Sequence, residues 1–272
     1  MKRILNIKPS RFSALCLGLL PLLICVVIYM IASDLRLEAN PNDKLLPSFS
    51  QMGEAWSRMA LTPNVRTGEY IFWGDTWSSL QRLLLGMLIA ASVGLLIGLL
   101  TGAIPLMGAT FSPLITVLSL IPPLALLPIL FIVFGLGELS KVALIAIGIT
   151  PFIARDIQRR CQEIPIEQLI KAQTLGANTS QVLIRVLLPQ LMPKLLDAVR
   201  LSLGAGWLFL IAAEAIASTD GLGYRIFLVR RYMSMDVILP YVAWITCLAF
   251  ILDQVLALLS RKLFPWHVKG GH

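Results

Sequence analysis

The sequence has 272 residues, of which 57% are hydrophobic and only 14% charged, with a formal net charge of +8. This balance excludes an ordinary soluble domain and indicates an all-α integral membrane protein. The basic residues lie beside apolar runs rather than in a patch with interleaved aromatic side chains, which argues against nucleic acid as a partner.

Six apolar runs are long enough to cross a bilayer, because a hydrocarbon core of about 30 Å takes about 20 helical residues. The first run also follows basic residues as a signal peptide would, but no small-residue cleavage site precedes Asp34, which favours a retained anchor. The four cysteines suggest no disulfide framework. The six runs cover residues 13–32, 79–104, 109–136, 141–156, 197–217 and 238–259.

The distribution of basic residues predicts the topology. With the N-terminus in the cytoplasm, six crossings place the basic loop 157–193 and the basic tail on the same, inner side. The sequence therefore predicts a cytoplasmic N-terminal tail (1–12), a first transmembrane helix (13–32), a periplasmic segment (33–78), a five-helix core (79–260) that includes the loop 157–193, and a cytoplasmic C-terminal tail (261–272).

The periplasmic segment contains a candidate amphipathic helix. Ser48 and Gln51 have the spacing of a capping box, and apolar side chains then recur on one helical face. Such a helix fits the membrane surface or a packed position on the bundle equally well. The apolar face would consist of Phe49, Met52, Trp56 and Met59.

Small residues recur at every fourth position of the second run. In lipid, helices associate through close backbone approach along such positions, so this helix is expected inside the bundle. The small-residue stripe consists of Gly86, Ala90, Gly94, Gly98 and Gly102.

Prolines interrupt the third run. Pro122, Pro123 and Pro128 each remove a backbone donor, so the helix is expected to kink or break, leaving carbonyl groups that need partners. A helix broken at membrane depth is typical of a transport pathway. A bent helix with a purely structural role is the alternative.

Residues 157–193 are too polar for a span and too regular for a loose loop. Apolar positions at helical spacing lead to Gly176, a natural helix end, and Asn178, Thr179 and Ser180 offer N-caps for a second helix that Pro189 should close. The expected helix–turn–helix on the cytoplasmic face is suited to a groove of another protein. Periodicity alone fits equally well a hairpin that packs only on its own bundle.

This hairpin resembles the EAA loop of the permease subunits of binding-protein-dependent ABC importers, whose pattern is E-A-A-x3-G-x9-I-x-L-P. The first two letters fall on Ile170 and Lys171, so the glutamate is absent, whereas Ala172, Gly176 and the Leu188–Pro189 pair match. Four further segments resemble the nitrate, sulfonate and taurine subgroup of these permeases: L-P-S-F-S-Q near residue 46, and residues 122–141, 212–224 and 261–267.

The resemblance implies a MetI-like bundle of six transmembrane helices with a cytoplasmic coupling helix, in a bacterial inner membrane. The implied partners are a second copy of the chain as a homodimer, two ABC ATPase subunits that bind ATP and Mg, and a periplasmic solute-binding protein. The implied cargo is a small anion such as a sulfonate, taurine or nitrate. No G-x4-G-K-[ST] motif occurs, so no cofactor and no catalysis are expected in this chain.

The resemblance also implies coupling and docking residues, while the residues themselves suggest candidates for the pathway and no metal site. The ATPase-coupling residues would be Ile170, Lys171, Ala172, Gln173, Thr174, Leu175, Gly176, Ala177, Leu188 and Pro189. The candidates for the translocation pathway are Ser119, Pro122, Pro123, Pro128, Trp207 and Glu214. The candidates for docking the binding protein are Asp220, Gly221, Gly223, Tyr224 and Arg225, where the two glycines would form a tight turn.

Several charged and aromatic residues allow two interpretations. Glu214 should face a wet cavity or a cation, because a charge at mid-membrane is costly, or else lie near enough to the outer interface to be solvated. Arg82 and the cluster Arg225, Arg230 and Arg231 would attract anions, or bind lipid or the delivery protein. Asp253 is expected to pair with a basic residue. For Trp207 and Phe209, core packing is favoured over a place in the pathway.

Two other functions compete with that of an importer permease. An intramembrane enzyme has little to work with, since the only histidines are His267 and His272 and no G-x-S-x-G or H-E-x-x-H motif occurs. A free-standing channel or a structural membrane subunit fits the broken helix and the small-residue stripe as well. An ATPase-docking hairpin is the feature that separates an importer permease from these.

Overall fold

The computed structural model describes residues 10–41, 43–63 and 68–266, in which the regular elements are all helical. Of the two predicted tails, residues 1–9 and 267–272 lie outside the described residues. The elements are α1 (Arg11–Ala39), α2 (Phe49–Ala60), α3 (Ile71–Ala103), α4 (Pro105–Leu120), the 3-10 turn η2 (Pro123–Leu126), α5 (Leu127–Phe134), α6 (Glu138–Gln162), α7 (Ile166–Thr174), α8 (Thr179–Gln181), the π-helical turn η3 (Val182–Leu187), α9 (Leu188–Ile216), α10 (Leu222–Arg230) and α11 (Met235–Leu263).

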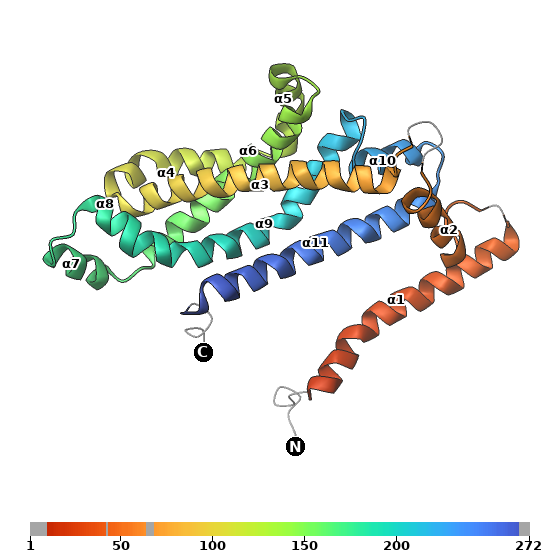
Figure 1. The fold of residues 1–272 in the computed structure, drawn as a ribbon, viewed down its shortest axis with the longest axis horizontal. Helices are drawn as coiled ribbons and strands as arrows, with labels where there is room; N and C mark the ends of the chain where they lie inside the picture. Colours follow the sequence, from red (N-terminus) through yellow and green to blue (C-terminus); the bar gives the residue numbers. More distant parts are fainter. Residues whose placement is uncertain (1–9, 42, 64–67, 267–272) are drawn as a thin grey trace.

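The long helices form an elongated bundle with two distinct ends. Helices α7 and α8 lie at one end, which we call the hairpin end, and α2 and α10 lie at the other, which we call the α10 end (Figure 1). Helix α1 runs beside the bundle. Near the α10 end, two of its side chains donate hydrogen bonds to the segment that connects α1 to α2. There, Tyr29 Oη donates to the Pro47 carbonyl at 2.7 Å and Ser33 Oγ to the Leu46 carbonyl at 3.0 Å.

The number of membrane-crossing helices differs from the prediction. By length and composition, four of the described helices qualify, namely α1, α3, α11 and the continuous helix Thr179–Ile216, and the bent pair α4–α5 makes up to five. Helix α6, predicted as the fourth span (141–156), does not qualify because charged residues lie toward both of its ends. The predicted count of six is therefore not confirmed.

Helix α3 packs closely along α6, as the small-residue stripe predicts. A methyl group placed on Gly98 would lie 2.6 Å from the Ala154 carbonyl oxygen and 2.7 Å from Ile157 Cβ, so only glycine allows this approach. The other glycines of the stripe are in similar contact with α6: Gly86 with Ile145, Gly94 with Ile153, and Gly102 with Cys161. The predicted place of this helix inside the bundle is confirmed.

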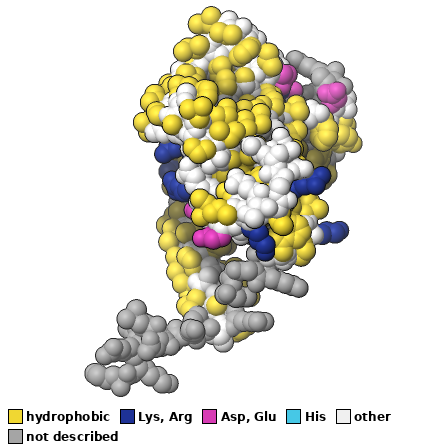
Figure 2. Space-filling view, turned by 90° about the vertical axis from the view of Figure 1, so that its left-hand side faces the viewer, with side chains coloured by type: hydrophobic (Ala, Val, Ile, Leu, Met, Phe, Trp, Pro, Cys, Tyr) yellow, Lys and Arg dark blue, Asp and Glu magenta, His cyan; other side chains and the backbone are white. Residues whose placement is uncertain are grey.

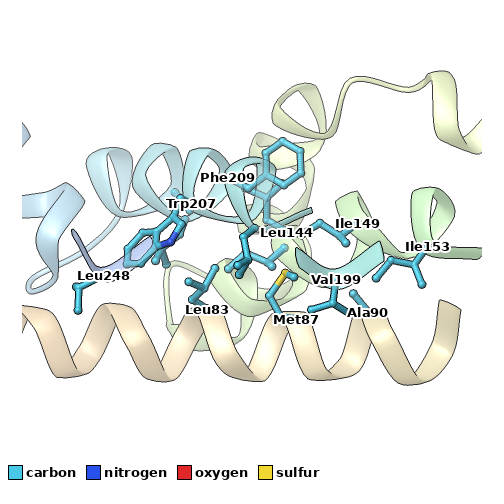
Figure 3. Close-up of a cluster of buried hydrophobic side chains, with 14 of the residues drawn as sticks. Leu83, Met87, Ala90, Leu144, Ile149, Ile153, Val199, Trp207, Phe209 and Leu248 are labelled. Carbon is cyan, nitrogen blue, oxygen red and sulfur yellow. The ribbon is translucent and has the colours of Figure 1, made fainter. Parts of the chain in front are cut away.

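The hydrophobic core lies where α3, α6 and α9 meet (Figure 3). Trp207 and Phe209 are only 4% and 6% exposed, which confirms the core packing favoured for these aromatic side chains. The core also includes Leu83, Met87 and Ala90 from α3, Leu144, Ile149 and Ile153 from α6, and Val199 from α9.

The third apolar run breaks at the predicted prolines. Helix α4 ends at Leu120, the backbone of Ile121 and Pro122 is extended, and the segment Pro123–Phe134 is turned by 84° from α4. Gly148 of α6 makes room for this break, because a methyl group there would lie 2.9 Å from Pro123 Cβ and 2.8 Å from the Phe209 ring. Pro123 is thus packed against α6 and α9, whereas Ile121, Pro122, Leu124 and Ala125 around it are exposed.

The second helix of the predicted hairpin does not end at Pro189, so that prediction is wrong. The chain remains helical from Thr179 to Ile216. Proline removes one backbone donor, and the π-helical turn Val182–Leu187 shifts the preceding bonds, so that the Leu188 N–H donates to the Leu183 carbonyl. The proline is therefore accommodated inside a continuous helix.

Candidate functional site

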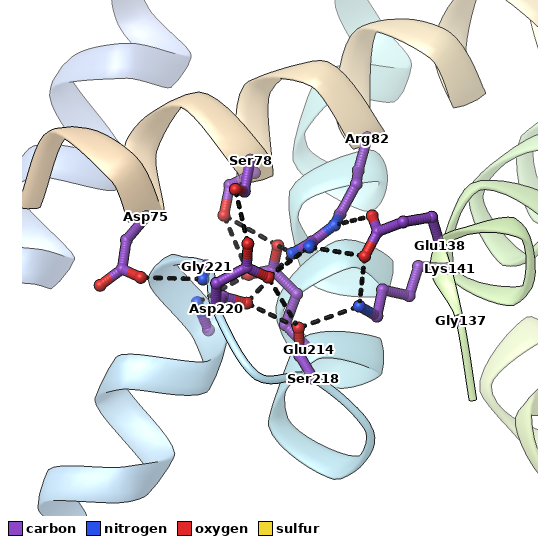
Figure 4. Close-up of polar contacts among 12 residues, drawn as sticks. Asp75, Ser78, Arg82, Gly137, Glu138, Lys141, Glu214, Ser218, Asp220 and Gly221 are labelled. Carbon is purple, nitrogen blue, oxygen red and sulfur yellow. Dashed lines mark hydrogen bonds and ion pairs between the residues drawn. The ribbon is translucent and has the colours of Figure 1, made fainter. Parts of the chain in front are cut away.

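At the α10 end, a charged network is built around Arg82 of α3 (Figure 4). The guanidinium makes five hydrogen bonds, equal to the number of its N–H groups. Nε and Nη2 donate to the Glu138 carboxylate, Nη1 to Glu214 Oε1 at 2.7 Å and to the Asp220 carbonyl at 3.1 Å, and Nη2 also to Asp220 Oδ1 at 2.5 Å. Three acidic side chains from different segments thus meet on one cation.

The network has a buried core and a wet rim. The side chains of Arg82 and Glu214 are 4% and 0% exposed, whereas those of Glu138 and Asp220 are 63% and 47% exposed. Glu214 therefore pairs with a cation, as one of the two interpretations predicted, and the alternative of a solvated glutamate is wrong. Its assignment to the translocation pathway stays a prediction.

Side chains of α3 and α9, Glu214 among them, cap the first turn of α10. The amide of Gly221 donates to Asp75 Oδ1 at 3.0 Å, that of Leu222 to Ser79 Oγ at 2.8 Å, and that of Gly223 to Glu214 Oε2 at 2.8 Å. Free N–H groups at a helix start need acceptors and favour negative charge, and here α3 and α9 supply them.

The predicted tight turn with two glycines needs correction. Gly221 has φ +110° and lies against Glu214, so it fits a turn that only glycine adopts easily. Gly223 instead lies within α10 and permits close contact with the Ile211 carbonyl. Both glycines are buried, and their amides donate to Asp75 and Glu214. The other three docking candidates, Asp220, Tyr224 and Arg225, are partly exposed.

Further ion pairs extend the network on both sides. Arg225 Nε donates to Asp75 Oδ2 at 2.8 Å, and Lys141 Nζ donates to Glu138 at 2.9 Å and to Ser218 at 2.9 Å. In the loop before α10, partial burial raises the pKa of Asp220, but the hydrogen bonds from Arg82 and Ser78 outweigh it and hold that pKa below its usual value. The arrangement clamps α3, α6, α9 and α10 together and leaves little free cationic charge.

The pathway candidates are not gathered in one place. Ser119, Pro122 and Pro123 lie at the break and Pro128 lies in α5, whereas Trp207 is in the core and Glu214 belongs to the charged network. At the break, Ser119 Oγ donates to the Thr116 carbonyl at 2.7 Å and accepts from Arg155 Nη1 at 2.7 Å.

Sequence reasoning missed Arg155 as a site residue, because it stands at the end of the predicted fourth run (141–156) and was grouped with the basic residues of the inner loop that follows. It belongs instead to α6 and reaches toward α4. A polar contact one turn further on, from Gln158 Nε2 to Ser112 Oγ at 2.5 Å, marks the same face. Ser112 and Ser119, two turns apart in the largely apolar α4, are the sequence signal that could have indicated this polar face.

At the hairpin end, Gly176 ends α7 as predicted. It has φ +87°, its amide donates to the Gln173 carbonyl at 2.9 Å, and the Ala177 amide donates to the Ala172 carbonyl at 3.0 Å, which is a Schellman motif. Asn178 then caps the second helix in a capping box with Gln181. The predicted helix–turn–helix start is thus confirmed.

Helix α7 presents two faces. Leu169 and Ala172 pack against the core, while Ile166, Ile170 and Leu175 are 64%, 55% and 80% exposed. The hairpin therefore carries uncovered apolar side chains besides those that pack on its own bundle. Figure 2 views this end and shows Lys and Arg side chains beside hydrophobic surface. Of the other coupling candidates, Lys171, Gln173, Thr174, Gly176 and Pro189 are exposed, and Ala177 and Leu188 are partly buried.

The described residues hold no group of three or more His, Cys, Asp or Glu side chains placed to bind a metal ion. What they hold is a membrane bundle with one broken helix and an exposed hairpin at one end. These features are those of a multi-pass membrane protein. Residues 94–265 match the family described as the inner membrane component of binding-protein-dependent transport systems, and the chain belongs to this family.

The relatives agree with this assignment. The chain is 37% identical to the taurine transport system permease protein TauC of Escherichia coli (strain K12), over 72% of this chain and 71% of TauC. It is 31% identical to the putative aliphatic sulfonates transport permease protein SsuC of Bacillus subtilis (strain 168), over 73% of each chain. A chain of the inward-facing MetNI methionine ABC transporter shares the fold, with a TM-score of 0.63, 20% identity, and coverage of 71% of this chain and 96% of that one.

The chain is therefore a permease subunit of an ABC importer, with the MetI-like fold, and it matches the nitrate, sulfonate and taurine subgroup of these permeases. Family membership decides against the rival interpretations as a free-standing channel or a structural membrane subunit. Proteins of this family are transport components rather than enzymes, and they reside in the membrane as multi-pass proteins.

Proposed function

We propose that two copies of this chain form the pathway of an importer for a sulfonate or a similar small oxyanion, with the hairpin end in the cytoplasm. Two ATPase subunits would each bind one hairpin and supply ATP and Mg, and a periplasmic protein would deliver the solute at the α10 end. The substrates of the relatives, taurine and aliphatic sulfonates, support this choice of cargo. Both described chain ends, near Ser10 and Trp266, would then face the cytoplasm.

The exposed apolar face of α7 is the observation that carries the proposal. Ile166 and Ile170 lie one turn apart, and Leu175 follows at the helix end, so all three can enter a groove on one partner. The exposed Lys171 and Arg185 place positive charge beside them, on the side where cytoplasmic loops are enriched in Lys and Arg. ATP-driven motion of this hairpin would rock the bundle about the broken helix α4–α5.

The remaining site assignments are part of the same proposal. Ser119 and the prolines of the break would line the pathway. At the α10 end, the partly exposed Asp220, Tyr224 and Arg225 would meet the binding protein, with Gly221 and Gly223 shaping the backbone behind them.

Replacing Gly176 with valine tests the hairpin. A left-handed residue other than glycine costs about 1–2 kcal/mol, and no atom lies within 4 Å of the position that a Cβ would occupy, so strain in the turn is the only effect. We expect the variant to assemble with the ATPase and to hydrolyse ATP. The amount of taurine taken up per ATP hydrolysed should fall well below that of wild type. Both rates are measured in proteoliposomes that contain the complete importer.

The matched control is Gly176→Asn, because asparagine tolerates left-handed geometry better than valine. This variant should keep uptake coupled to hydrolysis. Normal uptake by Gly176→Val would contradict the proposed role of the hairpin.

A further inference from the structure

Arg155 is an arginine without an acidic partner inside the bundle. It lies seven residues before the end of α6, which is about 10 Å at a helical rise of 1.5 Å per residue. Its one hydrogen bond to the described chain is from Nη1 to Ser119 Oγ at 2.7 Å. No Asp or Glu in the described ranges lies within 4.0 Å of its guanidinium, which has five N–H donors.

Three other arginines of the bundle have acidic partners. Arg82 pairs with three acidic residues, Arg200 forms two hydrogen bonds to Asp253 at 2.8 and 3.0 Å, and Arg225 pairs with Asp75. A cation in the membrane interior is costly unless it has a counter-charge or water. A guanidinium held by a single hydroxyl group is therefore available to an anion that does not belong to this chain.

The direction of the side chain argues against a role at the lipid headgroups. Helix α4 starts at the hairpin end, directly after α3 ends there, and Ser119 lies fourteen residues after Pro105, or about 21 Å along α4. The guanidinium therefore reaches away from the hairpin end and toward the break. A snorkelling arginine would instead extend toward the nearby end of its own helix.

The contact lies immediately before the break. Ser119 is followed by Leu120, the last residue of α4, and the extended Ile121 and Pro122 come next. Arg155 donates to the serine hydroxyl and to no backbone carbonyl of the described chain, so it does not cap the end of α4. Ser119 accepts from Nη1 alone, so the other N–H groups of the guanidinium have no hydrogen-bond partner in the described ranges.

We propose that Arg155, oriented by Ser119, binds the oxyanion group of the transported solute as it passes the break between α4 and η2. The planar guanidinium offers paired N–H donors that match a sulfonate, carboxylate or nitrate, which a single ammonium group does not. This inference rests on the proposed import of a small oxyanion and assigns to it a residue that selects the cargo.

The test is uptake of taurine, ethanesulfonate and nitrate by proteoliposomes that contain the complete importer, at saturating loaded binding protein. Arg155→Gln should lower uptake of the best of these solutes by about tenfold or more. Stimulation of ATP hydrolysis by the loaded binding protein should stay within about twofold of wild type, which a general structural defect would not allow. Arg261→Gln, the same change at an exposed arginine of α11, should leave uptake unchanged.

Two further variants decide the question if Arg155→Gln does not assemble. Ser119→Ala should lower uptake several-fold because it removes the group that orients the guanidinium. Arg155→Lys keeps the charge but loses the planar fork, so its uptake should also fall, and less steeply than that of Arg155→Gln. Wild-type uptake in both variants would overturn the inference.

Lipid composition separates the solute from a phospholipid headgroup as the bound oxyanion. The uptake ratio of wild type to Arg155→Gln should be the same in pure phosphatidylcholine and in a mixture with phosphatidylglycerol. A ratio that falls to one without the anionic lipid would assign Arg155 to lipid and overturn the inference. If wild type imports a solute and Arg155→Gln imports it equally well, the inference fails alone; if wild type imports none of the three, the proposed function fails with it.

Discussion

Replacing Arg82 with methionine is expected to lower the free energy of unfolding by about 3–5 kcal/mol, because it leaves a buried carboxylate without its cation. The Glu214 side chain has no exposed surface. Its ion pair with Arg82 Nη1 at 2.7 Å is the only ion pair that it forms with the described residues. Ser79 and the Gly223 amide remain as hydrogen-bond donors, but neither carries a charge. The measurement is an SDS titration of the purified chain in mixed micelles, followed by circular dichroism.

The double variant Arg82→Met with Glu214→Gln should recover most of that loss. A neutral amide can still accept hydrogen bonds from Ser79 and Gly223, and the other two partners of Arg82, Glu138 and Asp220, are exposed enough to be hydrated. Arg58→Met, at an exposed arginine of α2, should change the free energy of unfolding by no more than about 0.5 kcal/mol. A loss below about 1 kcal/mol for Arg82→Met would show that the network does not hold this end together.

The charged network restricts where the permease can move. It joins α3, α6, α9 and the start of α10 through Arg82, Glu138, Glu214 and the Gly221–Gly223 amides. Its buried members, Arg82, Glu214 and the Gly221–Gly223 amides, are all hydrogen-bonded, and such groups change partners only at high cost. Conformational change during transport is therefore expected at the break in α4–α5 and at the hairpin, and less within this clamp.

Features that depend on neighbouring residues could be predicted from the sequence. The capping box of Ser48 and Gln51, the end of α7 at Gly176 and the break at Pro122 all follow from local backbone chemistry, and each is present in the structure. The small-residue stripe also indicated which helix lies inside the bundle, because in lipid such a stripe stabilises a helix through close backbone contact with a neighbour. The stripe could not indicate that α6 is the partner.

Features that depend on how helices align could not be predicted. Arg82 and Glu214 are 132 residues apart, and the sequence offered several arginines as the partner of this glutamate. Their pairing depends on the register of α3 against α9, which no local pattern records. The prediction that the helix ends at Pro189 was wrong for another reason. A proline ends a helix only where the backbone cannot change the spacing of its hydrogen bonds, and here the π-helical turn Val182–Leu187 changes that spacing.

Replacing Gly98 with alanine is expected to lower the free energy of unfolding by about 2–3 kcal/mol through overpacking between α3 and α6. The new methyl group would lie 2.6 Å from the Ala154 carbonyl oxygen and 2.7 Å from Ile157 Cβ. Neither atom can move without its backbone, so the two helices must separate and lose contact along the whole stripe. The same SDS titration measures the change, and Ile157→Ala should not rescue it, because the carbonyl and the Cβ both remain.

Gly206 of α9 provides the matched control, since it is also a buried glycine in the interior of a helix. A methyl group there would meet Leu83 Cδ1 at 3.1 Å and Met87 Sδ at 3.2 Å, which are the ends of flexible side chains. Methionine in particular adapts its shape to its surroundings, so Gly206→Ala should cost less than about 1 kcal/mol. If Gly98→Ala were equally mild, the contact between α3 and α6 would have to yield without backbone movement, and the close approach of these helices would not be what fixes the bundle.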